Sequence, residues 1–283
     1  LTRGGELRLS IEAAFGYHMC VADSGQIEAR VNGWLWGQDD LLQAFRDADG
    51  GTGLDAYCRF ASMVYRRPIT KADKTERFVG KVCVLGLGFQ MGAPKFQLTM
   101  AKGALGGPPV YFSMDEAKGI VNTYRRANPR IVAGWEICAK IIEDMAAGRE
   151  GAHGPISWEK ETIWLPNGMC LKYPDLKKGI SEDTGWDEWT YQAKDIRKKI
   201  YGGLLCENIV QALARIIVAW QMLQISRKYR VVMTTHDEVV AVAKIIQADK
   251  CFAFMEKWMK TAPWWCPDLP LNCEGGHAQN YSK

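Results

Sequence analysis

The sequence predicts a mixed α+β fold, and two features of its 283 residues indicate this. Short apolar runs with the length of buried strands occur toward both ends of the chain, whereas the middle consists mostly of segments with helical spacing. The composition is 47% hydrophobic and 24% charged, which is typical of a globular protein with ample core. The length is about twice that of an ordinary domain, so we expect one large domain or two intergrown ones.

The location of the protein is predicted from what the sequence lacks. Charge or glycine interrupts its apolar stretches within about ten residues, short of the ~20 that a membrane helix needs. Nine cysteines without a Cys-x-x-Cys pair fit neither a disulfide framework nor a zinc site. We therefore expect a cytoplasmic protein that contacts no membrane. The chain begins with Leu1 rather than Met, and both a natural start and a truncation at residue 1 stay open.

The first predicted unit is a strand, a turn and a helix. Residues 17–22 form an apolar run that favours a buried strand, and residues 26–36 have helical spacing. Asp23 and Ser24 stand between them, and both are good helix N-caps. A carboxylate is thereby placed at a strand–helix junction.

The remaining elements follow from the same patterns. The turn residues Pro166-Asn167-Gly168 predict a hairpin over 163–173. Two apolar runs separated by His236-Asp237-Glu238 predict a strand pair, and a Pro/Trp-rich tail closes the chain. Helices are predicted at 54–65, 131–147, 204–227 and 248–260.

Local charge indicates a polyanionic ligand. Residues 59–102 contain nine Lys or Arg and two acidic residues, within a chain of net charge +4. Such a basic segment suits a nucleotide, RNA or DNA, although a solvated basic face would have the same composition.

Two acidic clusters could carry chemistry, Asp23 with Glu28 and Asp237 with Glu238. A plain hairpin would prefer Asn-Gly or Asp-Gly to His-Asp-Glu, so the second cluster indicates a function. Carboxylates fixed at strand ends can bridge a pair of Mg²⁺ ions for in-line phosphoryl chemistry.

The segment 76–92 is compatible with two structures. As a strand and glycine-rich turn it is close to a dinucleotide-binding loop, but its glycine spacing is one residue off and the expected acid is missing. As a helix it places Arg77, Lys81, Leu85 and Phe89 on one stripe, which suits a triphosphate at one end and a base at the other. The residues favour the helix without excluding the strand.

The glycines within that segment carry a further prediction. Gly80, Gly86 and Gly88 each cost a helix ~1 kcal/mol relative to alanine. We therefore expect a close approach of another backbone or a ligand, or a helix that moves.

These segments, in this order, resemble the palm and fingers of family A (DNA polymerase I-like) DNA polymerases, most closely the phage-borne branch. The three motifs that carry the resemblance are residues 23–30 (DSGQIEAR), residues 77–89 (RxxxKxxxLGxxF) and residues 235–239 (THDEV). Residues 165–168, 207–212 and 268–276 are also similar to phage examples, so the resemblance covers essentially the whole chain.

The resemblance implies a right-hand polymerase fold. The palm, an antiparallel sheet backed by helices, would comprise residues 1–40 and 200–283. Mostly helical fingers with connecting helices and a hairpin would comprise 41–199, and a thumb would be absent. The implied activity is template-directed addition of deoxynucleotides to a primer 3′-hydroxyl by two-metal nucleotidyl transfer, with release of pyrophosphate. The implied partners are primer–template DNA and deoxynucleoside triphosphates, and the sequence identifies no processivity partner.

The resemblance also implies roles for individual residues. Asp23 and Asp237 would hold two Mg²⁺ ions, with Glu238 supporting the metal site. Lys81 would both bind the triphosphate and protonate the departing pyrophosphate. The other implied nucleotide contacts are Arg77, Leu85, Phe89, Gln26, Tyr57 and Glu28, the last excluding the ribose 2′-hydroxyl. The implied primer–template contacts are His236, Gln211, Asn208 and Arg215.

The sequence departs from the family at a few positions, and other functions stay open. Leu85 stands where the family often has Phe or Tyr, and Phe89 stands where Tyr is more usual. Ser24 replaces a larger residue. The main alternative is a nucleic-acid-binding palm and fingers fragment that is inactive without its thumb. A dinucleotide-dependent oxidoreductase is the third hypothesis, and it requires a strand at 82–86.

Overall fold

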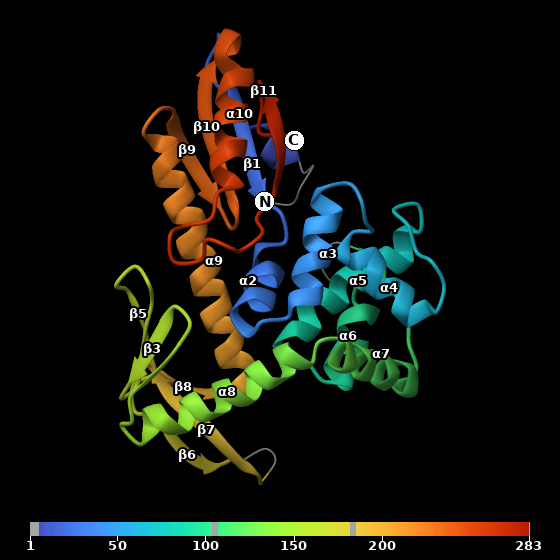
Figure 1. Ribbon diagram of the computed structural model, residues 1–283, viewed down its shortest axis with the longest axis vertical. Coiled ribbons are helices and arrows are strands. Elements are labelled where there is room, and N and C mark those ends of the chain that lie inside the picture. The colour runs from blue at the N-terminus through green and yellow to red at the C-terminus, as the bar shows by residue number, and fades with distance from the viewer. Residues whose placement is uncertain (1–5, 104–106, 182–184, 283) are drawn as a thin grey trace. The chain divides into compact units, whose positions relative to one another are not determined.

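The computed structural model describes residues 6–103, 107–181 and 185–282 (Figure 1). The chain divides into two compact units, and each is described by itself. Unit 1 comprises residues 1–27 and 212–283, and unit 2 comprises residues 28–211. The boundaries lie at 27/28 and 211/212, compared with 40/41 and 199/200 expected for palm and fingers, and that assignment stays a prediction.

Unit 1 is built around one antiparallel sheet with strand order β11-β1-β10-β9. The strands are β1 (Tyr17–Ser24), β9 (Arg230–Thr235), β10 (Glu238–Lys244) and β11 (Cys273–Ala278). Helix α10 (Ala248–Met259), preceded by the 3-10 turn η3 (Ile245–Gln247), packs along the sheet (Figure 1). The short helix α1 (Glu6–Leu9) and the end of α9 (Gly202–Ser226) complete the unit.

The inner position of β1 and β10 in the sheet explains why these two segments are so apolar. β1 and β10 each have neighbours on both sides, and both are almost wholly buried. Strands buried on both faces read as continuous apolar runs rather than alternating ones. On one face Met19, Val21, Val240 and Tyr281 form a core cluster. On the other face Cys20 lies against α10, where its thiol contacts the carbonyl of Ala248.

Unit 2 is mostly helical, with two small antiparallel sheets. Its helices are α2 (Ile27–Trp36), α3 (Asp39–Asp49), α4 (Ala56–Tyr65), α5 (Lys74–Gly86), η1 (Leu87–Phe89), α6 (Ala93–Ala101), α7 (Met114–Ala127), α8 (Pro129–Ala146) and the first part of α9. The sheets are β2 (Gly151–His153), β3 (Ile156–Glu159), β4 (Thr162–Trp164) and β5 (Cys170–Lys172), and β6 (Lys177–Ile180), β7 (Asp187–Ala193) and β8 (Ile196–Ile200). Local signals start several helices: Asp55 caps α4, Ser113 and Glu116 form a capping box on α7, and Pro129 opens α8.

The mixed α+β fold is as predicted, with differences at particular elements. The segment 76–92 is helical from its start to Gly86, so the strand that the oxidoreductase hypothesis requires at 82–86 is wrong. Phe89 lies in η1 rather than on the α5 stripe, because α5 ends three residues earlier. β1 continues through Asp23 and Ser24, which are therefore strand residues rather than N-caps of α2. β11 lies in the tail for which no strand was expected.

Helix α9 is long and rich in apolar residues. Its length and composition alone would allow it to cross a membrane, but 56% of its apolar window is buried inside the protein. Such burial is what the core helix of a globular protein shows. The cysteines behave similarly, since all nine are free thiols and eight are buried, as expected for small apolar side chains.

The close approach expected at the α5 glycines occurs at Gly80. A Cβ atom at this position would lie 2.1 Å from the carbonyl oxygen of Tyr57 on α4. The backbones of α4 and α5 can therefore pack this closely only because residue 80 has no side chain. This contact fixes the register between the two helices.

We expect Gly80→Ala to lower the free energy of unfolding by about 1–3 kcal/mol, since the added methyl forces the two helices apart. The matched control is Gly119→Ala on α7, where an added Cβ meets nothing within 4 Å. This control should gain about 0.5–1 kcal/mol from helix propensity. Urea unfolding of the two variants measures both changes. Equal effects at the two positions would contradict the close-approach explanation.

Candidate active site

Asp23 of the first motif and the two acidic residues of the third motif lie close together along the chain fold of unit 1. In the β1/β10 register Asp23 stands directly opposite Glu238, and Asp237 occupies the adjoining turn. The backbone N–H of Ser24 donates to the carbonyl of Asp237 over 3.0 Å, which ties this turn to the end of β1. Opposed residues on paired strands point to the same face, so the carboxylates of Asp23 and Glu238 share one side of the sheet. Both are buried, with 4% of each residue exposed.

Glu238 is bound by residues from both ends of the chain. One terminal nitrogen of Arg8 donates to both carboxylate oxygens over 2.9 Å, and the Tyr281 hydroxyl donates to Oε1. The Arg8 guanidinium also stacks 3.7 Å from the centre of the Tyr281 ring. Burial and the adjacent Glu238 raise the pKa of Tyr281, so its hydroxyl remains a donor at neutral pH. Glu238 thus belongs to a buried ion pair next to Asp23.

Two residues at the turns of this site have left-handed backbones. His236, between β9 and β10, has φ 54°, and Gln26, between β1 and α2, also has φ 54°. Non-glycine residues adopt this conformation at a cost, and such positions cluster at functional sites. Arg215 on α9 supports the first turn, since its guanidinium donates to the His236 carbonyl over 3.3 Å and to the Thr234 hydroxyl over 3.4 Å.

The residues of this site fit magnesium by the chemistry of their donors. Asp23 and Asp237 offer carboxylate oxygens, which are the ligands that Mg²⁺ prefers. Within residues 6–103, 107–181 and 185–282 no group of three His, Cys, Asp or Glu side chains could hold a metal by itself. That is compatible with Mg²⁺, because this ion usually binds through one or two carboxylates together with substrate phosphates and water.

The residues of the second motif lie on α5 in unit 2. Arg77, Lys81 and Leu85 are all partly exposed, whereas the intervening Val79, Gly80, Val82, Cys83 and Val84 are buried. The first three positions of the predicted stripe therefore share the accessible face of the helix. Phe89 is also partly exposed, but from η1.

Arg77 is bound to the start of α4. Its Nε donates to Oδ2 of Asp55 over 2.9 Å, and its guanidinium carbon lies 5.4 Å from the centre of the Tyr57 ring. Tyr57 is itself buried, with 6% of its surface exposed. Burial opposes ionisation of Asp55, but hydrogen bonds from the Cys58 N–H and from Arg77 outweigh it and lower the pKa of Asp55.

The predicted primer–template residues differ in their hydrogen-bond partners and in their exposure. In unit 2 the amide of Asn208 donates to the Tyr173 hydroxyl over 3.1 Å, and exposed Gln211 contacts Glu207 over 3.5 Å. In unit 1 His236 is exposed at its turn. Glu28, predicted near the sugar, lies in α2 just past the unit boundary.

Sequence patterns did not indicate Arg8, Tyr281 or Asp55 as parts of these sites. Arg8 and Tyr281 contact Glu238 from 230 and 43 residues away, and no local spacing reports such a contact. Asp55 does have a local signal, because an Asp before a helical segment is a typical N-cap. Its second partner, Arg77, appears only when α4 and α5 pack together.

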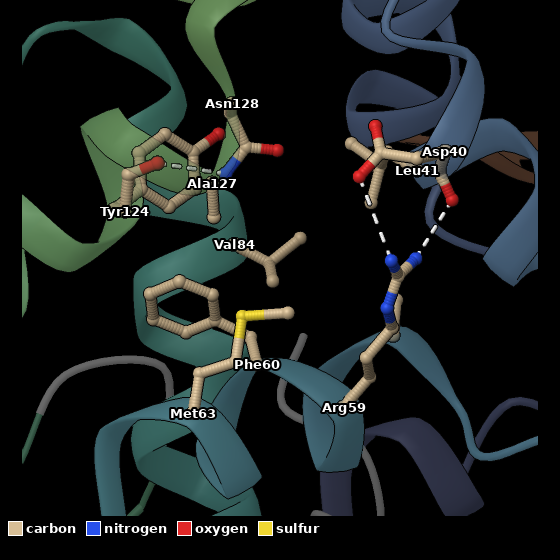
Figure 2. A pocket seen from close by; sticks show the side chains of 10 residues that line it. Asp40, Leu41, Arg59, Phe60, Met63, Val84, Tyr124, Ala127 and Asn128 are labelled. Carbon is tan, nitrogen blue, oxygen red and sulfur yellow. Dashed lines mark hydrogen bonds and ion pairs between the residues drawn. The ribbon is translucent and has the colours of Figure 1, made fainter.

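A pocket in unit 2 lies among α3, α4, α5 and α7 (Figure 2). Phe60, Met63, Val84 and Tyr124 contribute apolar side chains, and Arg59 reaches across to Asp40 at its edge (Figure 2). None of the sequence-predicted site residues lines it. We assign it no part in the chemistry.

Comparisons with known proteins agree with the predicted resemblance to DNA polymerases. No protein-family model matches the chain. The chain is 30% identical to a DNA polymerase of Bacillus phage SP02 over 285 residues, which covers 95% of this chain and 42% of the phage protein. A 90-residue stretch is 33% identical to DNA polymerase I of Chloroflexus aurantiacus, covering 32% of this chain and 9% of that protein.

The predicted resemblance to DNA polymerase I-like enzymes is confirmed. A solved structure also shares the fold, the POL domain of Pol1 from M. smegmatis in complex with DNA primer-template and dNTP. Its TM-score is 0.71 at 16% identity, and the match covers 99% of this chain and 43% of that one. The polymerase-type α+β fold is thereby confirmed, while the chain spans well under half the length of the SP02 polymerase.

The buried Arg8–Glu238 pair gives a stability prediction. Arg8→Met removes the cation but keeps most of the side-chain volume, so Glu238 stays buried without its ion partner. We expect the free energy of unfolding to fall by about 3–5 kcal/mol, as measured by urea unfolding. The double variant Arg8→Met/Glu238→Gln should recover much of this loss, because no buried charge remains.

The control for this prediction is an exposed ion pair in the same unit. Lys260→Met removes the partner of Glu256 on α10, where both side chains are about 40% exposed, and should leave stability nearly unchanged. An Arg8→Met protein as stable as Lys260→Met would show that the buried pair contributes nothing.

Proposed function

We propose that this chain is the palm and fingers part of a template-directed DNA polymerase, which adds deoxynucleotides to a primer 3′-hydroxyl and releases pyrophosphate. The observation that carries the proposal is the position of Asp23 and Asp237 at the β1/β10 junction, where the Ser24 N–H donates to the Asp237 carbonyl, in a chain related to DNA polymerases. Palm would correspond to residues 1–40 and 200–283, and fingers to residues 41–199.

In unit 1 the carboxylates would hold two Mg²⁺ ions. Asp23 and Asp237 would be the ligands, and the bound metal would lower the pKa of the primer hydroxyl and neutralise charge on the phosphate. Glu238 supports the site indirectly, since its carboxylate is bound by Arg8 and Tyr281 and anchors the first residue of β10. His236, at the tip of the same turn, would lie against the primer terminus, and Arg215 would hold that turn while contacting DNA.

In unit 2 the accessible face of α5 would bind the nucleotide. Arg77 and Lys81 are cations one helical turn apart, a spacing that suits the phosphates of one triphosphate. Lys81 would also donate the proton that the departing pyrophosphate needs. Leu85 and Phe89 would contact the base, with Tyr57 close to the phosphates.

The remaining assignments concern selectivity and the duplex. Gln26 would line the nucleotide pocket, and the carboxylate of Glu28 would exclude a ribose 2′-hydroxyl. Asn208 and Gln211, on one helix, would contact primer and template through their amides. Base pairing with the template would select each nucleotide. If a phage encodes the protein, we expect it to act in the host cytoplasm.

Primer extension tests this proposal. The wild-type chain, with a short primer–template, Mg²⁺ and four deoxynucleotides at low salt, should extend the primer by at least one nucleotide. We expect Asp237→Ala to lower the rate by about a hundredfold or more, because a metal ligand is lost. Asp249→Ala should extend normally, since that carboxylate is 96% exposed on α10 and pairs with His277 over 2.9 Å.

The outcomes separate the polymerase from its alternative. Extension that survives Asp237→Ala contradicts the assigned metal site. A wild-type chain that binds primer–template but never extends it contradicts the proposed activity and favours the nucleic-acid-binding fragment.

A further inference from the structure

Asp55 has two sets of partners at the start of α4. Its Oδ1 accepts from the backbone N–H of Tyr57 over 3.1 Å and of Cys58 over 2.9 Å, which caps the helix. Its Oδ2 accepts from Nε of Arg77 over 2.9 Å. The carboxylate is largely enclosed, with 12% of the side chain exposed, whereas a third of the Arg77 side chain is accessible. One carboxylate therefore joins the cap of α4 to a cation on the accessible face of α5.

Which guanidinium nitrogen Asp55 binds determines whether Arg77 can still bind a phosphate. A guanidinium has five N–H donors, and Asp55 engages the one on Nε. Phosphate groups are usually bound in bidentate fashion, through parallel N–H bonds from the fork of the guanidinium. Because Asp55 binds the inner nitrogen, the ion pair restrains the guanidinium and uses neither terminal amino group.

The frame around this contact is rigid. The two backbone bonds fix the Asp55 carboxylate relative to α4, and the close approach of Gly80 to Tyr57 fixes α4 relative to α5. Gly80 is three residues after Arg77, so the same helical turn carries the contact and the cation. The ring of Tyr57 provides a second restraint on the guanidinium.

We propose that Asp55 is a positioning residue for nucleotide binding, which holds Arg77 by Nε so that its terminal amino groups meet the triphosphate. The inference rests on the proposed function, in which Arg77 contacts the triphosphate. An unrestrained arginine loses rotamer freedom when it binds a phosphate, whereas one held in advance loses little. This gain in preorganisation outweighs the partial neutralisation of Arg77, because the carboxylate is bonded to Nε rather than to the phosphate-binding fork.

Equilibrium binding of one deoxynucleoside triphosphate to the 283-residue chain with primer–template tests the proposal, using Ca²⁺ in place of Mg²⁺ to prevent turnover. Asp55→Asn keeps an oxygen to cap α4 but turns an amide toward Arg77, so the dissociation constant should rise about tenfold. In an Arg77→Ala background the same substitution should have no further effect. A cap acting only on stability would change binding equally in both backgrounds.

Ser113→Ala is the matched control. It removes the N-cap of α7, where Ser113 accepts from the Glu116 N–H over 3.2 Å, in the same unit and without contact to Arg77. It should lower the melting temperature, as Asp55→Asn does, yet bind the nucleotide as the wild type does. An equal loss of affinity in both variants overturns the proposal.

A second readout observes the guanidinium directly. In ¹H–¹⁵N spectra the Arg77 Nε–H of the wild type should exchange slowly with water, and Asp55→Asn should abolish this protection. Normal nucleotide affinity of Asp55→Asn, beside a normally binding wild type, overturns the positioning role alone. A wild type that binds no deoxynucleotide contradicts the proposed function, and the positioning role with it.

Discussion

Two carboxylates face each other where the inner strands of the unit 1 sheet end, and the candidate active site depends on how their repulsion is offset. Asp23 and Glu238 are cross-strand partners, a pairing that is unfavourable between two carboxylates and more so when both are buried. Arg8 supplies a buried cation that binds both oxygens of Glu238, and Tyr281 adds a neutral donor. The charge of Glu238 is thereby compensated within the protein. Under the proposed function, Asp23 and Asp237 would bind the metal beside this compensated pair.

Unit 2 also contains an ion pair between a carboxylate and a guanidinium, in which Asp55 binds Arg77. The guanidinium of Arg77 is only partly enclosed, and Asp55 binds it through Nε. The two ion pairs differ in how far solvent reaches them. Arg8 and Glu238 are sealed in the core, so they stabilise a turn, whereas Arg77 remains open to solvent and can exchange part of its hydration for a ligand.

Sequence patterns reached the parts of the fold that have local causes. β1 and β10 were predictable because inner strands are apolar throughout, and the turn at His236 stood out because its residues are poor choices for a simple hairpin. α5 was ambiguous because its glycines weaken a helix, and Gly80 is needed for a contact with α4 that no local pattern contains. β11 was missed because CEGGHA has two glycines and no apolar alternation, and its pairing with β1 makes it a strand.

The candidate site was predictable in its residue types but not in its internal contacts. Family motifs named the carboxylates of unit 1 and the cations of unit 2, since these lie in short contiguous segments. The partners that restrain them, Arg8 and Tyr281 for Glu238 and Asp55 for Arg77, come from 22 to 230 residues away. Such pairings depend on how strands and helices pack, so only the folded chain reveals them.

The discontinuity of unit 1 has a consequence for its synthesis. Residues 28–211, which form unit 2, leave the ribosome as one uninterrupted stretch and can fold while translation continues. Arg8 is made before unit 2, but its partners Glu238 and Tyr281 follow more than two hundred residues later. The contacts of Arg8 with these residues can form only after both have been synthesised, and closing so long a loop is slow. The turn at His236 and Asp237 is thus among the last parts of unit 1 to acquire its native contacts.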